Sequence, residues 1–131
     1  MGRGTNEMKC NHIPVLLLEG RTNILWSSKT FLEERGYDVH TARSQKEALY
    51  QIGRQHFSAL ITEYIVEGST TLKIVKQVKN ANPESYVLLL TNVNLDRKAH
   101  REFMAAGVDD YCIKPFPLEK ILEHLERGMR E

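Results

Sequence analysis

Apolar residues gather into five short runs along the chain, and between these runs they recur at helical spacing. The runs cover residues 13–18, 37–42, 57–62, 86–90 and 109–113. Nearly continuous apolar runs are typical of strands that are buried on both faces of a parallel sheet. We therefore expect five strands, of which the one at 37–42 is more exposed, whereas the run at 86–90 is the most apolar and belongs at the centre.

The stretches after each run predict five helices. They should begin at Thr22 or Asn23, at Ser44, at Ser69 or Thr70, at Leu95 and at Leu118. Ser44 followed by Glu47 has the spacing of a capping box, and Gly36, Pro83 and Gly107 are typical helix-ending residues. On the third helix we expect Lys73, Lys76 and Lys79 to face solvent.

Strands alternating with helices predict a doubly wound parallel α/β fold, a three-layer sandwich of five strands and five helices. Residues 13–131 form one domain in this interpretation. Residues 1–12 are polar and without apolar periodicity, so we predict a disordered tail. The chain would then be either a single-domain protein or a domain cut from a larger one.

Composition excludes several classes of protein. Lysine and arginine number 18 against 17 acidic residues, a net charge of +1, so no strong field favours nucleic acid or an anionic membrane. The apolar runs are too short to span a membrane. Cys10 and Cys112 lack the spacing of a metal site or a disulfide framework, which favours a reducing, cytoplasmic location.

Polar residues follow the strands at the edge of the sheet where ligands bind in such folds. Glu19 follows the first strand, Glu63 the third, Thr91 the fourth and Lys114 the fifth. The carboxyl ends of parallel strands meet at one crevice, so we expect two acids, a hydroxyl and an amine to converge there.

The segment Gly107-Val108-Asp109-Asp110-Tyr111-Cys112-Ile113-Lys114-Pro115-Phe116 resembles the pattern Gly-Ala-x-x-Tyr-hydrophobic-x-Lys-Pro-Phe of response-regulator receiver domains, the CheY-like family of two-component signalling. Only the alanine departs, and the resemblance extends from about residue 13 to about residue 128. It implies the strand order 2-1-3-4-5 and a cis peptide bond between Lys114 and Pro115. In that family an acid pair after strand one and an aspartate after strand three hold Mg²⁺, and the aspartate accepts a phosphoryl group from a histidine kinase. By this resemblance Thr91 is the hydroxyl and Lys114 the amine of the site, and Tyr111 is the aromatic residue that swings inward on activation.

Several positions depart from the family pattern. The acid pair is Glu19-Gly20, and Glu63 stands where the acceptor aspartate would be, while Glu67 and Asn92 replace residues that are commonly proline and alanine. Two acids and Lys114 give the site a charge of about −1 instead of about −2, which weakens Mg²⁺ binding. We expect no catalytic residue, no cofactor and no resident metal, with Glu19 and Glu63 as weak Mg²⁺ candidates.

Glu63 allows two interpretations. An ion pair with Lys114 would imitate the phosphorylated state, or Glu63 is a relic at a retired site. A carboxylate carries one charge where a phosphoryl group carries close to two, so the imitation is incomplete. In either case we expect a signalling domain that binds proteins and is not an enzyme.

The resemblance also implies where partners dock. A kinase, an output domain, a second receiver or a second copy of the chain would contact the face of the fourth helix, fifth strand and fifth helix. The expected contacts are Arg97, Lys98, Arg101, Tyr111, Lys120 and His124. The alternatives are a working receiver that accepts a phosphoryl group in the presence of Mg²⁺ and a flavodoxin-like binder of a small phosphorylated ligand.

Overall fold

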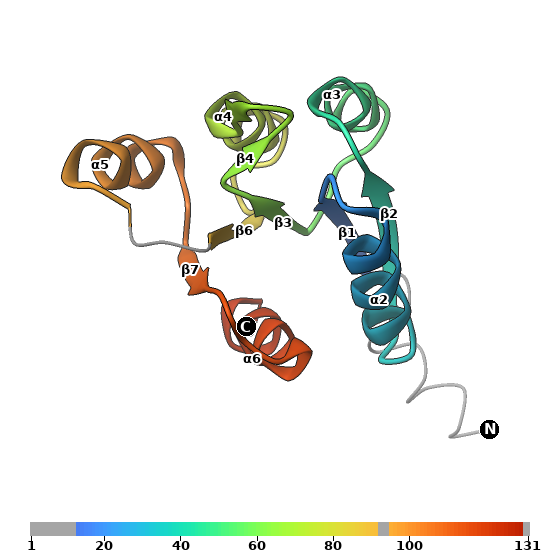
Figure 1. The fold of residues 1–131 in the computed structure, drawn as a ribbon. Helices are drawn as coiled ribbons and strands as arrows, with labels where there is room; N and C mark the ends of the chain where they lie inside the picture. The colour runs from blue at the N-terminus through green and yellow to red at the C-terminus, as the bar shows by residue number, and fades with distance from the viewer. Residues whose placement is uncertain (1–12, 92–94, 130–131) are drawn as a thin grey trace.

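The structure is a computed structural model that describes residues 13–91 and 95–129. The predicted tail at 1–12 and the position of Asn92 lie outside the described residues. In chain order the elements are β1 (Ile13–Leu18), α2 (Thr22–Glu33), β2 (Tyr37–Ala42), α3 (Gln45–Ile52), β3 (Ala59–Glu63), β4 (Ile65–Val66), β5 (Ser69–Thr70), α4 (Leu72–Ala81), β6 (Tyr86–Thr91), α5 (Arg97–Ala106), β7 (Asp110–Ile113) and α6 (Leu118–Gly128) (Figure 1).

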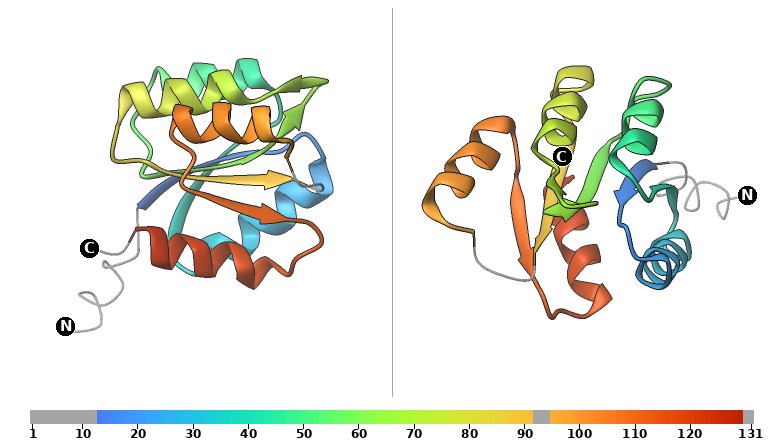
Figure 2. Two further views of the ribbon diagram at one scale, coloured as in Figure 1. Left: turned by 90° about the vertical axis from the view of Figure 1, so that its left-hand side faces the viewer. Right: turned by 45° about the horizontal axis from the view of Figure 1, so that its top comes forward.

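A five-stranded sheet forms the middle layer of the molecule. Its order is β2-β1-β3-β6-β7 and every neighbouring pair is parallel, which confirms the predicted fold and the order 2-1-3-4-5. Helices α3, α4 and α5 cover one face, and α2 and α6 cover the other (Figure 2). All five core strands therefore point their carboxyl ends to the same edge of the sheet.

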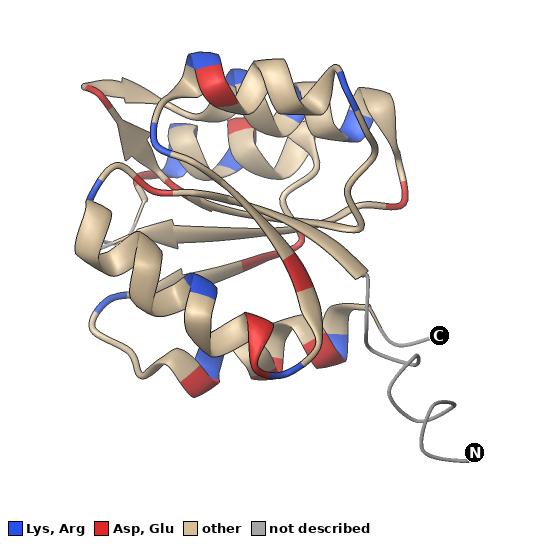
Figure 3. Cartoon of the chain, turned by 90° about the vertical axis from the view of Figure 1, so that its right-hand side faces the viewer, with Lys and Arg blue, Asp and Glu red and all other residues tan. Residues whose placement is uncertain are grey.

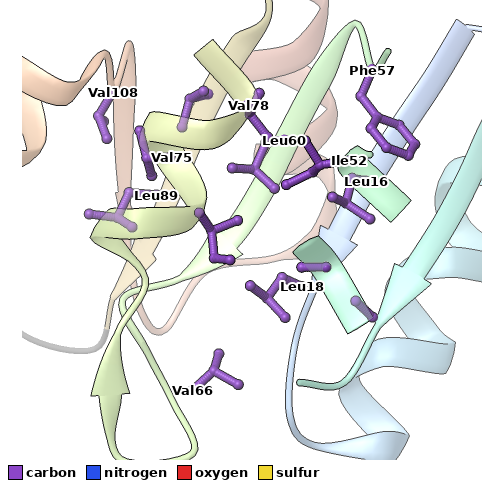
Figure 4. Packing of buried hydrophobic residues seen from close by; sticks show 14 of the residues in the cluster. Leu16, Leu18, Ile52, Phe57, Leu60, Val66, Val75, Val78, Leu89 and Val108 are labelled. Atoms are coloured by element: carbon purple, nitrogen blue, oxygen red, sulfur yellow. The ribbon is translucent and has the colours of Figure 1, made fainter. Parts of the chain in front are cut away.

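The alternation of side chains along β1 divides the core into two halves. Leu16 and Leu18 join the apolar cluster beneath α3, α4 and α5, whereas Val15 and Leu17 join the cluster beneath α2 and α6 (Figure 4). Successive side chains of a strand point to opposite faces, so a strand covered on both sides must be apolar at every position. This explains the continuous apolar runs in the sequence.

Several local predictions are confirmed. The Ser44 hydroxyl accepts a hydrogen bond from the backbone N–H of Glu47, as a helix cap should. Gly107 ends α5 in the left-handed conformation, with φ +117°. The peptide bond between Lys114 and Pro115 is cis.

The segment before α4 differs from the prediction. The sequence predicts a helix from Ser69 or Thr70, but these residues form β5 and pair with β4 in a short antiparallel hairpin, and α4 begins at Leu72. Glu67 and Gly68 connect the two strands with φ values of +57° and +79°, the backbone that a two-residue hairpin turn requires. The side-chain amide of Gln45 donates to the carbonyls of Val66, Ser69 and Thr70, so the hairpin is attached to α3.

Other differences are smaller and concern single residues. Helix α5 begins two residues later than predicted, because the side chain of Asp96 accepts from the N–H of Ala99 and caps it. Lys79 does not face solvent freely, since its Nζ lies 3.2 Å from Asp109 Oδ2. The predicted solvated lysine row therefore holds for Lys73 and Lys76, which are exposed.

Candidate functional site

The register of the sheet brings the predicted site residues to one level. Leu18 of β1 pairs with Thr62 of β3, so Glu19 and Glu63 follow in adjacent positions. On the other side of β3, Thr91 ends β6 opposite Ile113, and Lys114 comes next. All four residues line a single cavity of about 410 Å³. Residues 64–67, which lead into and form the first half of the β4–β5 hairpin, make another wall of this cavity. The full lining is Glu19, Gly20, Arg21, Glu63, Tyr64, Ile65, Val66, Glu67, Thr91 and Lys114.

An ion pair occupies the position where the family resemblance places phosphoryl chemistry. Lys114 Nζ lies 2.7 Å from Glu63 Oε2, and the two side chains are only 21% and 13% exposed. The contact between Glu63 and Lys114 that the first of the two interpretations requires is therefore present. A carboxylate and an ammonium this close and this poorly hydrated attract each other more strongly than an exposed pair does.

Arg21 also belongs to the site, and the sequence analysis did not include it. Its backbone N–H donates to Glu19 Oε2 at 2.9 Å and its Nε donates to the same oxygen at 3.2 Å. One terminal nitrogen of the guanidinium lies 3.8 Å from Glu63 Oε2. We call Glu19, Arg21, Glu63 and Lys114 together the carboxylate site. The only sequence signal for Arg21 is a cation two positions after Glu19, in the loop that opens α2.

Burial and proximity shift the pKa values of the two acids in opposite directions. Burial, with a further contribution from the neighbouring Glu19, raises the pKa of Glu63 to about 7, although Lys114 opposes the shift. Burial alone would raise the pKa of Glu19 too, but hydrogen bonds with Glu63 and Arg21 lower it below its ordinary value. Of the two acids, Glu63 is therefore the one that keeps its proton as pH rises toward neutrality, and Glu19 is ionised.

The residues present do not fit a magnesium ion. Mg²⁺ is held by carboxylate oxygens and several waters in octahedral geometry, but Gly20 supplies no carboxylate, and the two acids that are present, Glu19 and Glu63, already contact Arg21 and Lys114. With both acids ionised, two cations balance two anions, so the charge of the carboxylate site is about zero and not the predicted −1. Within residues 13–91 and 95–129, no group of three or more His, Cys, Asp or Glu side chains could hold a metal ion.

Thr91 connects the carboxylate site to Tyr111. The Thr91 side chain is buried and lines both the cavity of the carboxylate site and a second cavity of about 300 Å³. Tyr111 lines this second cavity, with its ring 5.3 Å from the ring of His100. The hydroxyl of Tyr111 is buried and has no hydrogen-bond partner among the described residues. Tyr111 thus packs inward, toward the core beneath α4 and α5.

The predicted docking residues do not all lie at the surface. Arg97, Lys98 and Arg101 are exposed on α5, and the side chain of Lys120 on α6 is 52% exposed. His124 was predicted as a partner contact, but its side chain is only 8% exposed and its Nδ1 lies 3.0 Å from Asp110 Oδ2. The prediction was wrong for His124, because this residue shares the inward stripe of α6 with Ile121 and Leu125. We call the surface of α5, β7 and α6 the partner face.

Asp110 collects several donors at the opposite end of the sheet. Besides His124, Arg127 approaches its Oδ2 at 3.4 Å and the hydroxyl of Tyr86 donates to it at 3.3 Å. We call these four residues the Asp110 cluster. Because Asp110 and Tyr86 begin β7 and β6, the cluster ties the last turns of α6 to the amino ends of these strands.

Another cavity, of about 570 Å³, lies between β2 and α3 and is larger than that of the carboxylate site. Its only acid is Glu47, whose side chain accepts from the backbone N–H of Arg43 at the start of α3. Acidic and basic residues are interspersed along the chain in the view of Figure 3. This cavity and this mixed distribution of charge are therefore weaker candidates for a functional site than the cavity where Glu19, Arg21, Glu63 and Lys114 converge.

Comparison with known proteins agrees with this architecture. A family model described as response regulator receiver domain matches residues 15–126. The two-component response regulator PhoP of Pseudomonas aeruginosa is 27% identical over 117 residues, which cover 88% of this chain and 51% of that protein. The transcriptional regulatory protein CrdR of Helicobacter pylori is 28% identical over 113 residues, covering 86% of this chain and 53% of that protein. The chain thus spans about half the length of these relatives.

Solved structures superpose over nearly the whole chain. The chemotaxis response regulator CheY4 of Vibrio cholerae is 26% identical with a TM-score of 0.80, covering 90% of this chain and 99% of that one. A CheY-like receiver domain protein from Methanospirillum hungatei has the same fold, with a TM-score of 0.84 at 22% identity over 91% of this chain and 94% of that one. None of the helices in the described part of the chain has the length and apolar character needed to cross a membrane.

Proposed function

The chain belongs to the response regulator receiver domain family, and from that premise we propose that it is a signalling domain that acts without being phosphorylated. The observation that carries the proposal is the ion pair between Glu63 and Lys114, at 2.7 Å. Glu63 stands at the acceptor position of the family, and the amine that would contact a phosphoryl group already contacts its carboxylate. The domain would therefore bind other proteins in one fixed state and would not be an enzyme.

The electrostatics of the site support this proposal. Phosphoryl transfer needs a metal and an amine to neutralise the charge that develops on the phosphoryl oxygens. Here Gly20 leaves the second metal-binding position without a carboxylate, and Arg21 balances the remaining charge. The fixed pair imitates a phosphorylated site only in part, because a phosphoryl group brings close to two charges and three acceptor oxygens.

Thr91 and Tyr111 would carry this fixed state to the partner face. Thr91 forms a wall of both cavities, and Tyr111 is packed inward, the position that the family resemblance associates with activation. The partner face presents Arg97, Lys98, Arg101 and Lys120 together with the exposed apolar side chains of Met104 and Ile113, while Tyr111 lies partly buried beneath it. We propose a protein partner with acidic groups around an apolar patch, either a kinase, an output domain, a second receiver or a second copy of the chain. A cytoplasmic location belongs to the same proposal.

The decisive experiment is the intact mass of the chain after incubation with a small phosphodonor such as acetyl phosphate and Mg²⁺. The native chain should gain no phosphoryl group. A restored variant with Gly20→Asp, Arg21→Ala and Glu63→Asp should gain one, because it has the acid pair, the acceptor and no competing guanidinium. The backbone tolerates a side chain at position 20, since a Cβ there would lie 3.9 Å from its nearest neighbours.

The matched control replaces the new acceptor by asparagine and keeps the other two changes. It should stay unlabelled, which would place the phosphoryl group of the restored variant on residue 63. Labelling of the native chain at Glu63 would overturn the proposal and establish a working receiver. A folded restored variant that gains no mass would also contradict it, because the missing groups would then not be the cause of inactivity.

A further inference from the structure

We infer that Arg21 is a built-in cation that takes the place of a divalent metal ion in the carboxylate site. Its guanidinium contacts Glu19 and approaches Glu63, the two acids that would otherwise attract a metal. The disagreement between this site and Mg²⁺ therefore has a specific cause, and a change of one residue should reverse it.

The geometry shows why Arg21 is suited to this role. Glu19 is 97% buried as a side chain, and a buried carboxylate needs a cation and hydrogen-bond donors to stay ionised. Arg21 supplies both to one oxygen, from its backbone N–H and from Nε, so the loop and the side chain are fixed by the same acceptor. The planar guanidinium has five donors, and its remaining edge extends to Glu63.

Among the described residues, Arg21 is the cation that contacts Glu19. Glu19 Oε1 is buried and accepts from no cation among these residues, and the other side-chain hydrogen bond of Glu19 is with Glu63. Lys114 contacts Glu63 but not Glu19. Without Arg21, two acids and one lysine would leave a net charge of about −1 in the cavity, with no cation beside Glu19. Those are the conditions under which a carboxylate site attracts a hard cation.

Arginine and metal should consequently exclude each other. A metal ion that reached both carboxylates would have to displace the guanidinium and separate it from Glu19. This inference depends on the position of Arg21 and not on whether Glu63 can be phosphorylated. Metal binding and phosphoryl transfer are also measured separately, so failure of one proposal does not imply failure of the other.

The test is Mn²⁺ binding to the full chain at pH 8, with free Mn²⁺ followed by electron paramagnetic resonance. At this pH Glu63 is ionised, because its pKa is about 7. The native chain should show no saturable site at millimolar Mn²⁺, and Arg21→Ala should bind at least about tenfold more tightly. Arg21→Lys, which keeps the charge, should resemble the native chain. Arg54→Ala, which removes an exposed arginine that follows α3, is the matched control and should also resemble it.

Gly20→Asp sharpens the test through a double-mutant cycle. The added carboxylate should increase Mn²⁺ affinity strongly in the Arg21→Ala background and only slightly when Arg21 is present. If Arg21→Ala does not fold, as judged by circular dichroism, Arg21→Gln keeps the length and a donor for Glu19 and carries the same expectation. The inference is overturned if the native chain binds Mn²⁺ as tightly as the variants, or if folded variants without Arg21 gain no affinity.

Discussion

The two ends of the sheet each place acids among cations, but with opposite effects on Glu63 and Asp110. At the carboxyl end, Glu19 and Glu63 converge, and burial, with a further contribution from Glu19, raises the pKa of Glu63 to about 7. At the amino end, Asp110 is the single acid among His124, Arg127 and Tyr86. Burial alone would raise the pKa of Asp110, but these donors lower it below its ordinary value.

The difference separates a site from a structural clamp. A group whose folded-state pKa is raised, as for Glu63, stabilises the fold only at low pH, and this contribution is lost as pH rises toward about 7. A group whose folded-state pKa is lowered, as for Asp110, stabilises the fold at pH values above its ordinary pKa. It loses that contribution only in acid. Near neutral pH the ionisation of Glu63 therefore lowers the stability of the fold, whereas that of Asp110 raises it. Costly arrangements of this kind are more typical of functional positions than of structural ones.

The largest expected effect is the loss of the Asp110 cluster. Asp110→Ala should lower the free energy of unfolding at pH 7 by about 2–3 kcal/mol, because it leaves the buried His124 and the hydroxyl of Tyr86 without their acceptor. Urea unfolding measures this. The matched control is Asp38→Ala, which removes an exposed acid that contacts His40 and should cost less than about 1 kcal/mol. Equal losses in both variants would remove the distinction between clamp and surface pair.

A pH series should separate the carboxyl end from the amino end. For the native chain, Glu63 should lower the free energy of unfolding by about 2 kcal/mol as pH rises from about 5 to about 8. In Glu63→Gln this slope should disappear, because the amide does not ionise. Thermal or urea unfolding at four or five pH values measures the difference between the two curves. Parallel curves across this range would show that the pKa of Glu63 is not raised.

The smallest expected effect sets the baseline for both ends. Lys29 and Glu33 form an ion pair at 2.8 Å, one helical turn apart on α2, with side chains 24% and 41% exposed. Such pairs contribute about 0.2–0.5 kcal/mol, so Glu33→Gln should change the free energy of unfolding by no more than that, and less at high salt. A loss above about 1 kcal/mol would mean that an ordinary surface ion pair contributes as much to stability as the groups at the two ends of the sheet. The contrast between those ends would then not be significant.

Most of the fold could be predicted because its signals are local and repeated. Apolar runs marked the five core strands, and Ser44 and Gly107 marked helix ends where they are found. The β4–β5 hairpin was missed because it competes with α4 for Ser69 and Thr70, and its turn uses Glu67 at positive φ, which few non-glycine residues adopt. The pattern of apolar residues does not indicate whether Ser69 and Thr70 join the hairpin or the helix.

The candidate site could be predicted only as far as the strand ends define it. Glu63 ends β3 and Lys114 follows β7, the strands on either side of β6, so the topology brings both residues to the same edge of the sheet. Arg21 acts through a side chain that folds back across its own loop, and its role depends on distances that spacing does not encode. His124 was misplaced for a related reason, because a polar residue on an inward stripe becomes buried when an acid such as Asp110 receives it.

Position 20 has a consequence for how such domains can change over evolutionary time. A Cβ at Gly20 would meet only ordinary van der Waals neighbours, at 3.9 Å, and no positive φ requires glycine there. The backbone of this loop therefore does not itself require glycine at position 20. Under the proposed function, a lineage could pass between a switchable and a permanently set signalling domain in either direction by exchanging side chains, without rebuilding the fold that its partners recognise.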